Sequence, residues 1–139
     1  MNIDHIGLYV SDLEKTKSFF ETYFHASANE LYHNKTTGLK TYFLSFDNQT
    51  RLEIMHRPNL STKALNELLI GYHHVAFKLG TKEKVDELTL VLQNDGYEIV
   101  SRPRRTGDGY YEAVFKLEDY LIELVAWRKY SHSEYFLLI

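Results

Sequence analysis

Two histidines and two glutamates recur in matching segments of this chain. His5 lies in the segment DHIGLYV near the start, and His74 lies in HHVAFKL at the start of the second half. Glu53 lies in RLEIM and Glu123 in LIELV, and the two glutamates are separated almost as the two histidines are. The chain is therefore internally duplicated. Imidazole and carboxylate groups suit Zn²⁺, Ni²⁺, Fe²⁺, Mn²⁺ or Co²⁺, so the four residues predict a divalent-metal site.

Each of the four residues falls in a short apolar segment whose alternation predicts a β-strand. The four strands are expected over residues 3–10, 49–56, 72–79 and 120–126. Strand side chains alternate between faces, so the apolar neighbours would pack under a helix and the four polar groups would emerge on the other face. His73 has the opposite parity to His74 and is expected to face away from the ligands.

A helix is expected after the first strand of each half. Ser11 and Glu14 have the spacing of a capping box, and the first helix should end near His25. Thr81 can cap the second helix, which should stop at Asn94 and the Asp-Gly pair that follows. The remaining strands are expected over residues 29–33, 39–46, 97–101 and 110–117.

The order βαβββ thus occurs twice. It predicts an α+β fold of two tandem modules, whose curved sheets pair and enclose a concave metal site. The modules are expected over residues 1–57 and 71–127, with a linker over 58–70 and a C-terminal tail over 128–139. The apolar end of the tail needs cover, which favours a homodimer.

Composition narrows the class of protein. With 139 residues and a net charge of −3, the chain offers no basic surface for nucleic acid. It has no cysteine, so any metal must bind nitrogen and oxygen ligands. No segment has the pattern of a signal peptide or the length of a membrane span, so a cytoplasmic protein is expected.

The ligand set also favours catalysis over a purely structural metal. A single strand histidine is more often a satisfied polar residue than a ligand, but four positions here agree in register and in facing direction. Four protein ligands in an octahedral shell leave two positions for water or a small-molecule substrate. An open site of this kind is typical of an enzyme.

The duplication and the ligand order His, Glu, His, Glu resemble the vicinal oxygen chelate (glyoxalase/bleomycin resistance/dioxygenase) superfamily. The strongest resemblance is to the small bacterial glyoxalase I enzymes (lactoylglutathione lyases), over residues 1–127. It implies that one divalent metal is bound by His5, Glu53, His74 and Glu123. It also implies that the site lies either within one chain or across a homodimer interface.

The resemblance implies a carbon–sulfur lyase that isomerises the hemithioacetal of methylglyoxal and glutathione, or a similar vicinal-oxygen substrate, through an enediolate. By analogy the catalytic base is Glu123, with Glu53 as the alternative. The glyoxalase I arginine that lies near the glutathione carboxylate is replaced here by Tyr9. Arg51, Arg57, Lys78 and Arg105 are the cations considered as its substitute. Within the loop that follows residue 101, Arg105 and Tyr111 are further candidates for substrate binding.

Two other functions in the same superfamily are kept as alternatives. An extradiol-type dioxygenase uses two histidines and one glutamate on iron, so Glu53 would be one ligand too many. A non-catalytic drug- or antibiotic-binding protein would use an aromatic cavity, and such relatives usually lack the metal ligands.

Overall fold

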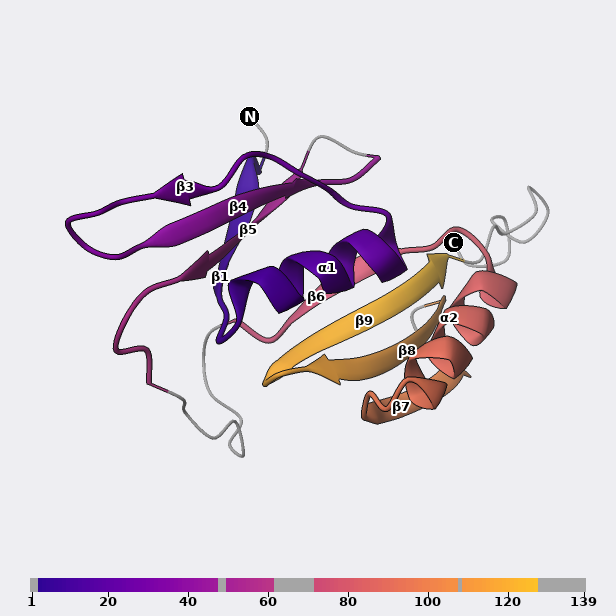
Figure 1. The fold of residues 1–139 in the computed structure, drawn as a ribbon. Helices are drawn as coiled ribbons and strands as arrows, with labels where there is room; N and C mark the ends of the chain where they lie inside the picture. The colour runs from indigo at the N-terminus through magenta and orange to yellow at the C-terminus, as the bar shows by residue number, and fades with distance from the viewer. Residues whose placement is uncertain (1–2, 48–49, 62–71, 108, 128–139) are drawn as a thin grey trace. The chain divides into compact units, whose positions relative to one another are not determined.

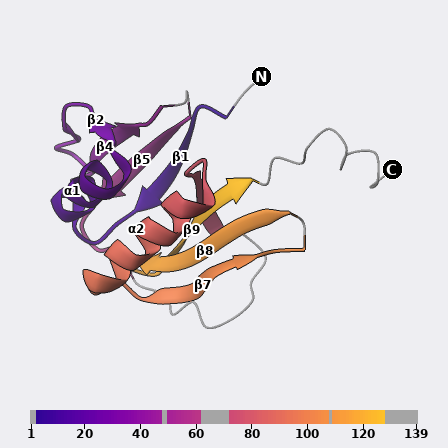
Figure 2. The same ribbon diagram turned by 90° about the vertical axis from the view of Figure 1, so that its right-hand side faces the viewer.

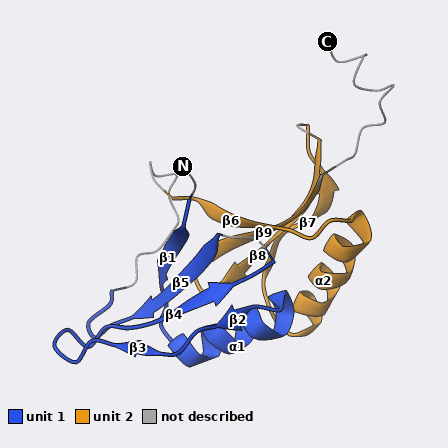
Figure 3. Ribbon diagram, turned by 90° about the horizontal axis from the view of Figure 1, so that it is seen from above, with its two compact units in different colours: residues 1–63 blue, residues 64–139 orange. Residues whose placement is uncertain are grey.

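The computed structural model describes residues 3–47, 50–61, 72–107 and 109–127. The chain divides into two compact units, residues 1–63 and 64–139 (Figure 3). The boundary falls within the expected linker over 58–70. Most of that linker, and the expected tail over 128–139, lie outside the described residues.

Unit 1 is a sheet covered on one face by a helix. Its elements are β1 (His5–Tyr9), α1 (Leu13–Phe24), β2 (Ser27–Ala28), β3 (Tyr32–His33), β4 (Lys40–Ser45) and β5 (Arg51–His56). The strand order is β1-β5-β4-β2, and β3 also pairs with β4. β1 runs parallel to β5, whereas the other pairs are antiparallel.

Unit 2 repeats this plan. Its elements are β6 (His74–Lys78), α2 (Lys82–Asn94), β7 (Ile99–Arg105), β8 (Tyr110–Leu117) and β9 (Tyr120–Trp127). The order β6-β9-β8-β7 matches that of unit 1, and β6 is again parallel to the last strand (Figure 1). Figure 2 shows α2 lying along this sheet, where it packs on β7, β8 and β9. The predicted α+β fold with tandem βαβββ modules is confirmed.

Two strands differ from the expectation. The strand predicted over residues 29–33 is instead the two short strands β2 and β3. β7 extends through Pro103 to Arg105, beyond the predicted end at residue 101. Proline is tolerated there because β7 is an edge strand, and its pairing with β8 shifts register on the way.

The N-cap of the first helix lies one residue later than predicted. Asp12, not Ser11, is the N-cap, and its side chain accepts a hydrogen bond from the Lys15 backbone N–H at 2.9 Å. The predicted Ser11–Glu14 capping box is therefore wrong. Glu14 instead accepts a hydrogen bond from the Tyr42 hydroxyl at 2.6 Å, which ties α1 to β4.

The other helix termini follow the prediction. His25 closes α1 in the left-handed conformation. Thr81 caps α2 by accepting a hydrogen bond from the Lys84 backbone N–H, and α2 ends at Asn94. Neither described helix is long and apolar enough to cross a membrane.

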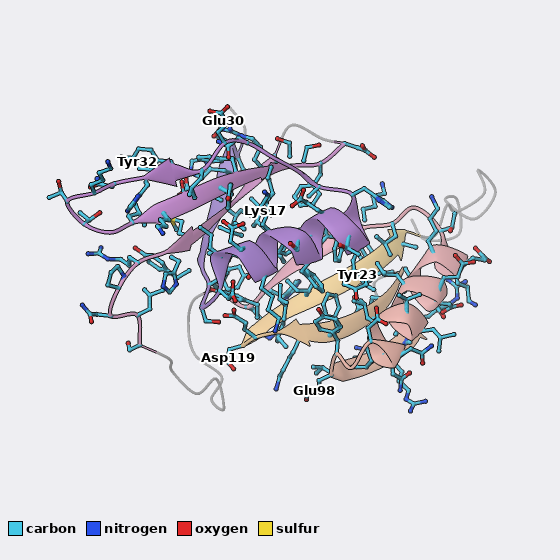
Figure 4. All side chains as sticks on the ribbon, viewed as in Figure 1. Lys17, Tyr23, Glu30, Tyr32, Glu98 and Asp119 are labelled. Carbon is cyan, nitrogen blue, oxygen red and sulfur yellow. The ribbon has the colours of Figure 1, made fainter. Side chains whose placement is uncertain are left out.

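Buried apolar residues lie between each sheet and its helix. In unit 1 they include Leu8, Leu44, Leu52 and Ile54, with Phe20 from α1 fully buried. In unit 2 they include Ala113, Phe115, Ile122 and Leu124, with Val85 and Leu92 from α2. Figure 4 shows Lys17 rising from α1 toward β4, where its Nζ lies 4.8 Å from the Tyr42 ring centroid. The other face of each sheet therefore carries the polar members of the strands.

Candidate functional site

His5 and Glu53 lie on the same face of the unit 1 sheet. In the parallel pair β1 and β5, Gly7 is the register partner of Glu53. His5 is two residues from Gly7, so its side chain shares that face. The alternate residues Leu52 and Ile54 are buried on the opposite face. The predicted facing direction of this His–Glu pair is confirmed.

The His5 ring is oriented by its neighbours. Asp4 Oδ2 accepts a hydrogen bond from His5 Nδ1 at 2.7 Å and another from Arg51 Nη2 at 3.0 Å. These two hydrogen bonds hold the pKa of Asp4 below its usual value. Phe43 meets the His5 ring edge-on, and the Arg51 guanidinium lies over Phe43. Asp4 therefore engages Nδ1, which leaves Nε2 as the nitrogen available to a ligand.

His74 and Glu123 occupy the equivalent positions in unit 2. Ala76 is the register partner of Glu123 in the parallel pair β6 and β9, and His74 is again two residues earlier. His74 Nε2 lies 3.4 Å from Glu123 Oε2. The Glu123 side chain is only 16% exposed, whereas that of His74 is 37% exposed. A partly buried carboxylate thus faces one imidazole nitrogen.

His73 contradicts the expectation that it faces away. Its Nδ1 lies 2.8 Å from His74 Nδ1, and the two rings meet edge-on. The parity argument fails because β6 begins at His74, so His73 lies before the strand and is not bound by its alternation. Asp4 and His73 thus have equivalent positions in the two units, since each contacts Nδ1 of the histidine that follows it.

The smallest side chains of the first strands lie beside the glutamates. Gly7 faces Glu53 and Ala76 faces Glu123 across the two parallel pairs. A Cβ added to Gly7 would come within 3.0 Å of the Met55 side chain. The Met55 side chain therefore occupies the space beside Gly7, whereas Ala76 contributes only a methyl group beside Glu123.

The unit 2 pair has dimensions that suit a divalent metal. With ligand–metal distances of about 2.1 Å, two ligand atoms lie about 3.0 Å apart on an octahedral ion and about 3.4 Å apart on a tetrahedral one. The 3.4 Å from His74 Nε2 to Glu123 Oε2 falls at the end of this interval. Within either unit, the described residues hold no group of three or more metal-binding side chains. Each unit by itself supplies one imidazole and one carboxylate.

The position four residues after each histidine lies on the same face as that histidine. In unit 1 it is Tyr9, which is 44% exposed. In unit 2 it is Lys78, which is also exposed. Unit 2 therefore carries a cation at the position that Tyr9 occupies in unit 1. Of the other cations considered, Arg51 is hydrogen-bonded to Asp4.

Tyr111 and Arg105 lie away from the His74–Glu123 face. Tyr111 is buried against α2, and its hydroxyl donates a hydrogen bond to Asp86. That hydrogen bond raises the pKa of Tyr111 and lowers the pKa of Asp86. The Arg105 guanidinium lies 5.7 Å from the Tyr111 ring centroid, and Lys82 Nζ lies 4.9 Å from it. The contacts of Tyr111 with Asp86 and Lys82 join α2 to the sheet, and the contact with Arg105 joins β8 to β7.

Sequence reasoning missed a polar pair on the Glu123 face. Glu112 is the register partner of Val125, so it shares that face, and its side chain is 14% exposed. Arg104 Nη2 lies 3.5 Å from Glu112 Oε1, and Arg104 Nε donates a hydrogen bond to Ser101. The strict alternation of β8 could have revealed Glu112, because its neighbours Tyr111 and Ala113 are apolar.

The chain is similar to one curated relative and to a solved structure of a variant of that relative. The chain is 31% identical to the fosfomycin resistance protein FosX of Listeria monocytogenes, over 89% of this chain and 88% of FosX. A structure of a variant of that FosX, in complex with Mn(II) and 1S,2S-dihydroxypropylphosphonic acid, matches with a TM-score of 0.67 and 27% identity. That match covers 97% of each chain.

A third similarity concerns the fold alone. A glyoxalase family protein from Bacillus cereus superposes with a TM-score of 0.75 at 20% identity, covering 93% of this chain and 95% of that protein.

The family model of the Glyoxalase/Bleomycin resistance protein/Dioxygenase superfamily matches residues 2–124. With its tandem βαβββ units and this match, the chain belongs to the Glyoxalase/Bleomycin resistance protein/Dioxygenase superfamily.

Proposed function

We propose that this protein is a divalent-metal-dependent lyase of the glyoxalase I type, which isomerises a small substrate with two neighbouring oxygens. The observation that carries this proposal is the repeated register of the two His–Glu pairs. In each unit the glutamate lies opposite the residue two positions after the histidine. A protein that binds no metal does not require the two His–Glu pairs to keep this register. One ion bound by both pairs does require it.

The two pairs serve a single cation in this proposal. His5, Glu53, His74 and Glu123 are its ligands, drawn from one chain or from two chains of a homodimer. A partly buried carboxylate such as Glu123 is costly without a compensating charge, and two such carboxylates together would repel each other. A divalent cation removes both costs. Ni, Zn, Co, Mn and Fe ions all suit this set of imidazole and carboxylate ligands.

The bound metal would act as a Lewis acid that stabilises negative charge on two neighbouring substrate oxygens. Glu123 removes the proton from the carbon that bears the hydroxyl and returns it to the neighbouring carbonyl carbon. The hydroxyl proton moves to the former carbonyl oxygen, so the substrate isomerises and no oxidant or reductant is consumed. Glu53 is the alternative base.

The proposal is tested with metal-free and metal-reconstituted protein on the hemithioacetal of methylglyoxal and glutathione, and on adducts of other thiols. Activity should require a divalent ion. Glu123→Gln should lower kcat by about a hundredfold to ten thousandfold, the usual contribution of a general base. Glu112→Gln, on the same face but outside the ligand set, is the control. Full activity of Glu123→Gln would contradict Glu123 as the base.

A second candidate function is favoured by the FosX similarity. That relative is described as a fosfomycin resistance protein, and its complex holds Mn(II) with a phosphonate that carries two hydroxyls. A phosphonate of this kind presents vicinal oxygens and an anion, which Lys78 could pair with. Consumption of fosfomycin, followed by ³¹P NMR with Mn²⁺, distinguishes this activity from hemithioacetal isomerisation.

The remaining alternatives have their own signatures. A dioxygenase would consume oxygen with an iron-loaded protein and a catechol. A drug-binding protein would bind its ligand equally well without metal. Mixing a His5→Gln chain with a His74→Gln chain also shows how a homodimer divides the ligands. About a quarter of the activity returns if each site combines units from two subunits, and none returns if each site lies within one chain.

A further inference from the structure

We propose that the metal-free protein holds its two ligand histidines in opposite tautomers. His5 carries its proton on Nδ1 and is ready to bind a metal through Nε2. His74 carries its proton on Nε2 and must exchange it before it can do the same. The metal-binding part of this inference rests on the proposed function, but the tautomers of the metal-free chain do not.

The His5 tautomer follows from Asp4. An ionised carboxylate only accepts hydrogen bonds, so the 2.7 Å contact between His5 Nδ1 and Asp4 Oδ2 requires the proton on Nδ1. Arg51 Nη2 donates to the same oxygen at 3.0 Å, so this Asp4 oxygen accepts hydrogen bonds from both of its nitrogen neighbours. A carboxylate that accepts from the second nitrogen of a histidine is the usual way in which metal ligands are oriented. In neutral His5 the lone pair therefore lies on Nε2.

The His74 tautomer follows from Glu123 and His73 together. Two neutral rings whose Nδ1 atoms are 2.8 Å apart share one proton, and either ring can be the donor. If His74 were the donor, its Nε2 lone pair would face the Glu123 carboxylate at 3.4 Å, which is repulsive. If His73 is the donor, His74 carries its proton on Nε2 and directs it at Glu123. The second arrangement satisfies both contacts.

Metal binding would therefore reorganise unit 2 but not unit 1. The His74 proton leaves Nε2, and a proton appears on Nδ1, which now donates to His73. His73 in turn carries its proton on its own Nε2. The pair keeps the same number of protons, and water can carry out the exchange. The duplicated chain thus has one histidine arranged for the metal in advance and one that responds to it.

The tautomers are read directly from long-range ¹H–¹⁵N NMR of ¹⁵N-histidine-labelled protein, at a pH at which both rings are neutral. His5→Gln and His74→Gln spectra assign the signals. The metal-free protein should show the Nδ1–H form at His5 and the Nε2–H form at His74. After addition of Zn²⁺, both rings should show Nδ1–H. An Nε2–H form at His5, or an Nδ1–H form at His74 before metal is added, would overturn the inference.

Variants separate orientation from simple loss of charge. Asp4→Ala should move His5 toward the Nε2–H form and weaken Zn²⁺ binding by about tenfold to a hundredfold, whereas Asp4→Glu should restore both in part. Glu21→Ala on α1 removes the same charge on the other face of the sheet and should change neither. If Asp4→Ala leaves the His5 tautomer unchanged, the inference is wrong. Predicted tautomers in a protein that binds no metal would contradict only the proposed function.

Discussion

Ala76 lies directly opposite Glu123 on the neighbouring parallel strand, two residues after His74. Gly7 holds the same position opposite Glu53 in unit 1. Side chains opposite each other on one face of a sheet lie close enough to interact, so a larger residue at position 76 would compete for the space beside Glu123. The small residues are as much a part of the repeat as the histidines and glutamates.

Ala76→Leu should therefore weaken divalent-metal binding by at least tenfold while the protein remains folded, because position 76 is exposed and outside the core. Isothermal titration calorimetry with Zn²⁺ measures the affinity, and circular dichroism checks the fold. Ala76→Ser, which keeps the side chain small, should bind nearly as the unchanged protein does. Equal affinities for the leucine and serine variants would show that this space is not used by the metal.

Lys78→Met should raise KM for an anionic substrate by about tenfold and leave kcat little changed. Lys78 lies on the face of His74 and is exposed, so its charge would contribute to binding of the anion and not to the chemical step. The effect should shrink as salt concentration rises, because exposed charges are screened. Lys84→Met on α2 is the matched control, and an equal rise in KM there would contradict a specific role for Lys78.

Tyr111→Phe should lower the free energy of unfolding at pH 7 by about 1 kcal/mol, the usual net value of one hydrogen bond. Asp86 has a lowered pKa in the folded state, chiefly because Tyr111 donates to it and secondarily because Lys82 does. The ionised Asp86 carboxylate contributes this stability above its unfolded-state pKa of about 3.9. The contribution is lost as the pH falls through the lower pKa of Asp86 in the folded state.

The pH dependence of the free energy of unfolding is measured by urea unfolding at several pH values below 7. The proteins compared are the unchanged protein, Tyr111→Phe and Asp86→Asn. Both variants should lose less stability than the unchanged protein as the pH falls through the region below about 4. The two changes should not add in the double variant, because they remove the same contact. Additive losses would mean that the Tyr111–Asp86 contact contributes nothing.

The sequence predicted the positions of the strands that carry the proposed metal ligands because the alternation of these strands is regular. Leu8 and Ile54 alternate with polar residues, and burial of the apolar set fixes which face His5 and Glu53 share. β8 was predicted with its observed bounds because the Gly-rich turn before it and the turn after it are both marked. Thr81 is a cap that the sequence identified without ambiguity.

The environment of the two proposed ligand histidines was harder to predict because it depends on residues just outside the strands. The alternation of strand side chains does not determine where His73 points, because β6 starts after it. Asp4 likewise precedes β1. Asp12 replaces Ser11 as the cap, a shift of one residue that propensity alone does not decide. Tyr111 follows the alternation of β8 and is buried against α2, which the loop interpretation of its neighbourhood overlooked.

The most direct test of the account is the metal content and affinity of protein purified without a metal-affinity step. We predict one divalent ion for each set of four ligands, hence one per chain. We also predict that His5→Gln and His74→Gln each weaken binding by at least a hundredfold, although they lie in different units. A protein that binds no divalent ion, or whose affinity survives the loss of either histidine, would contradict a metal shared by the two units.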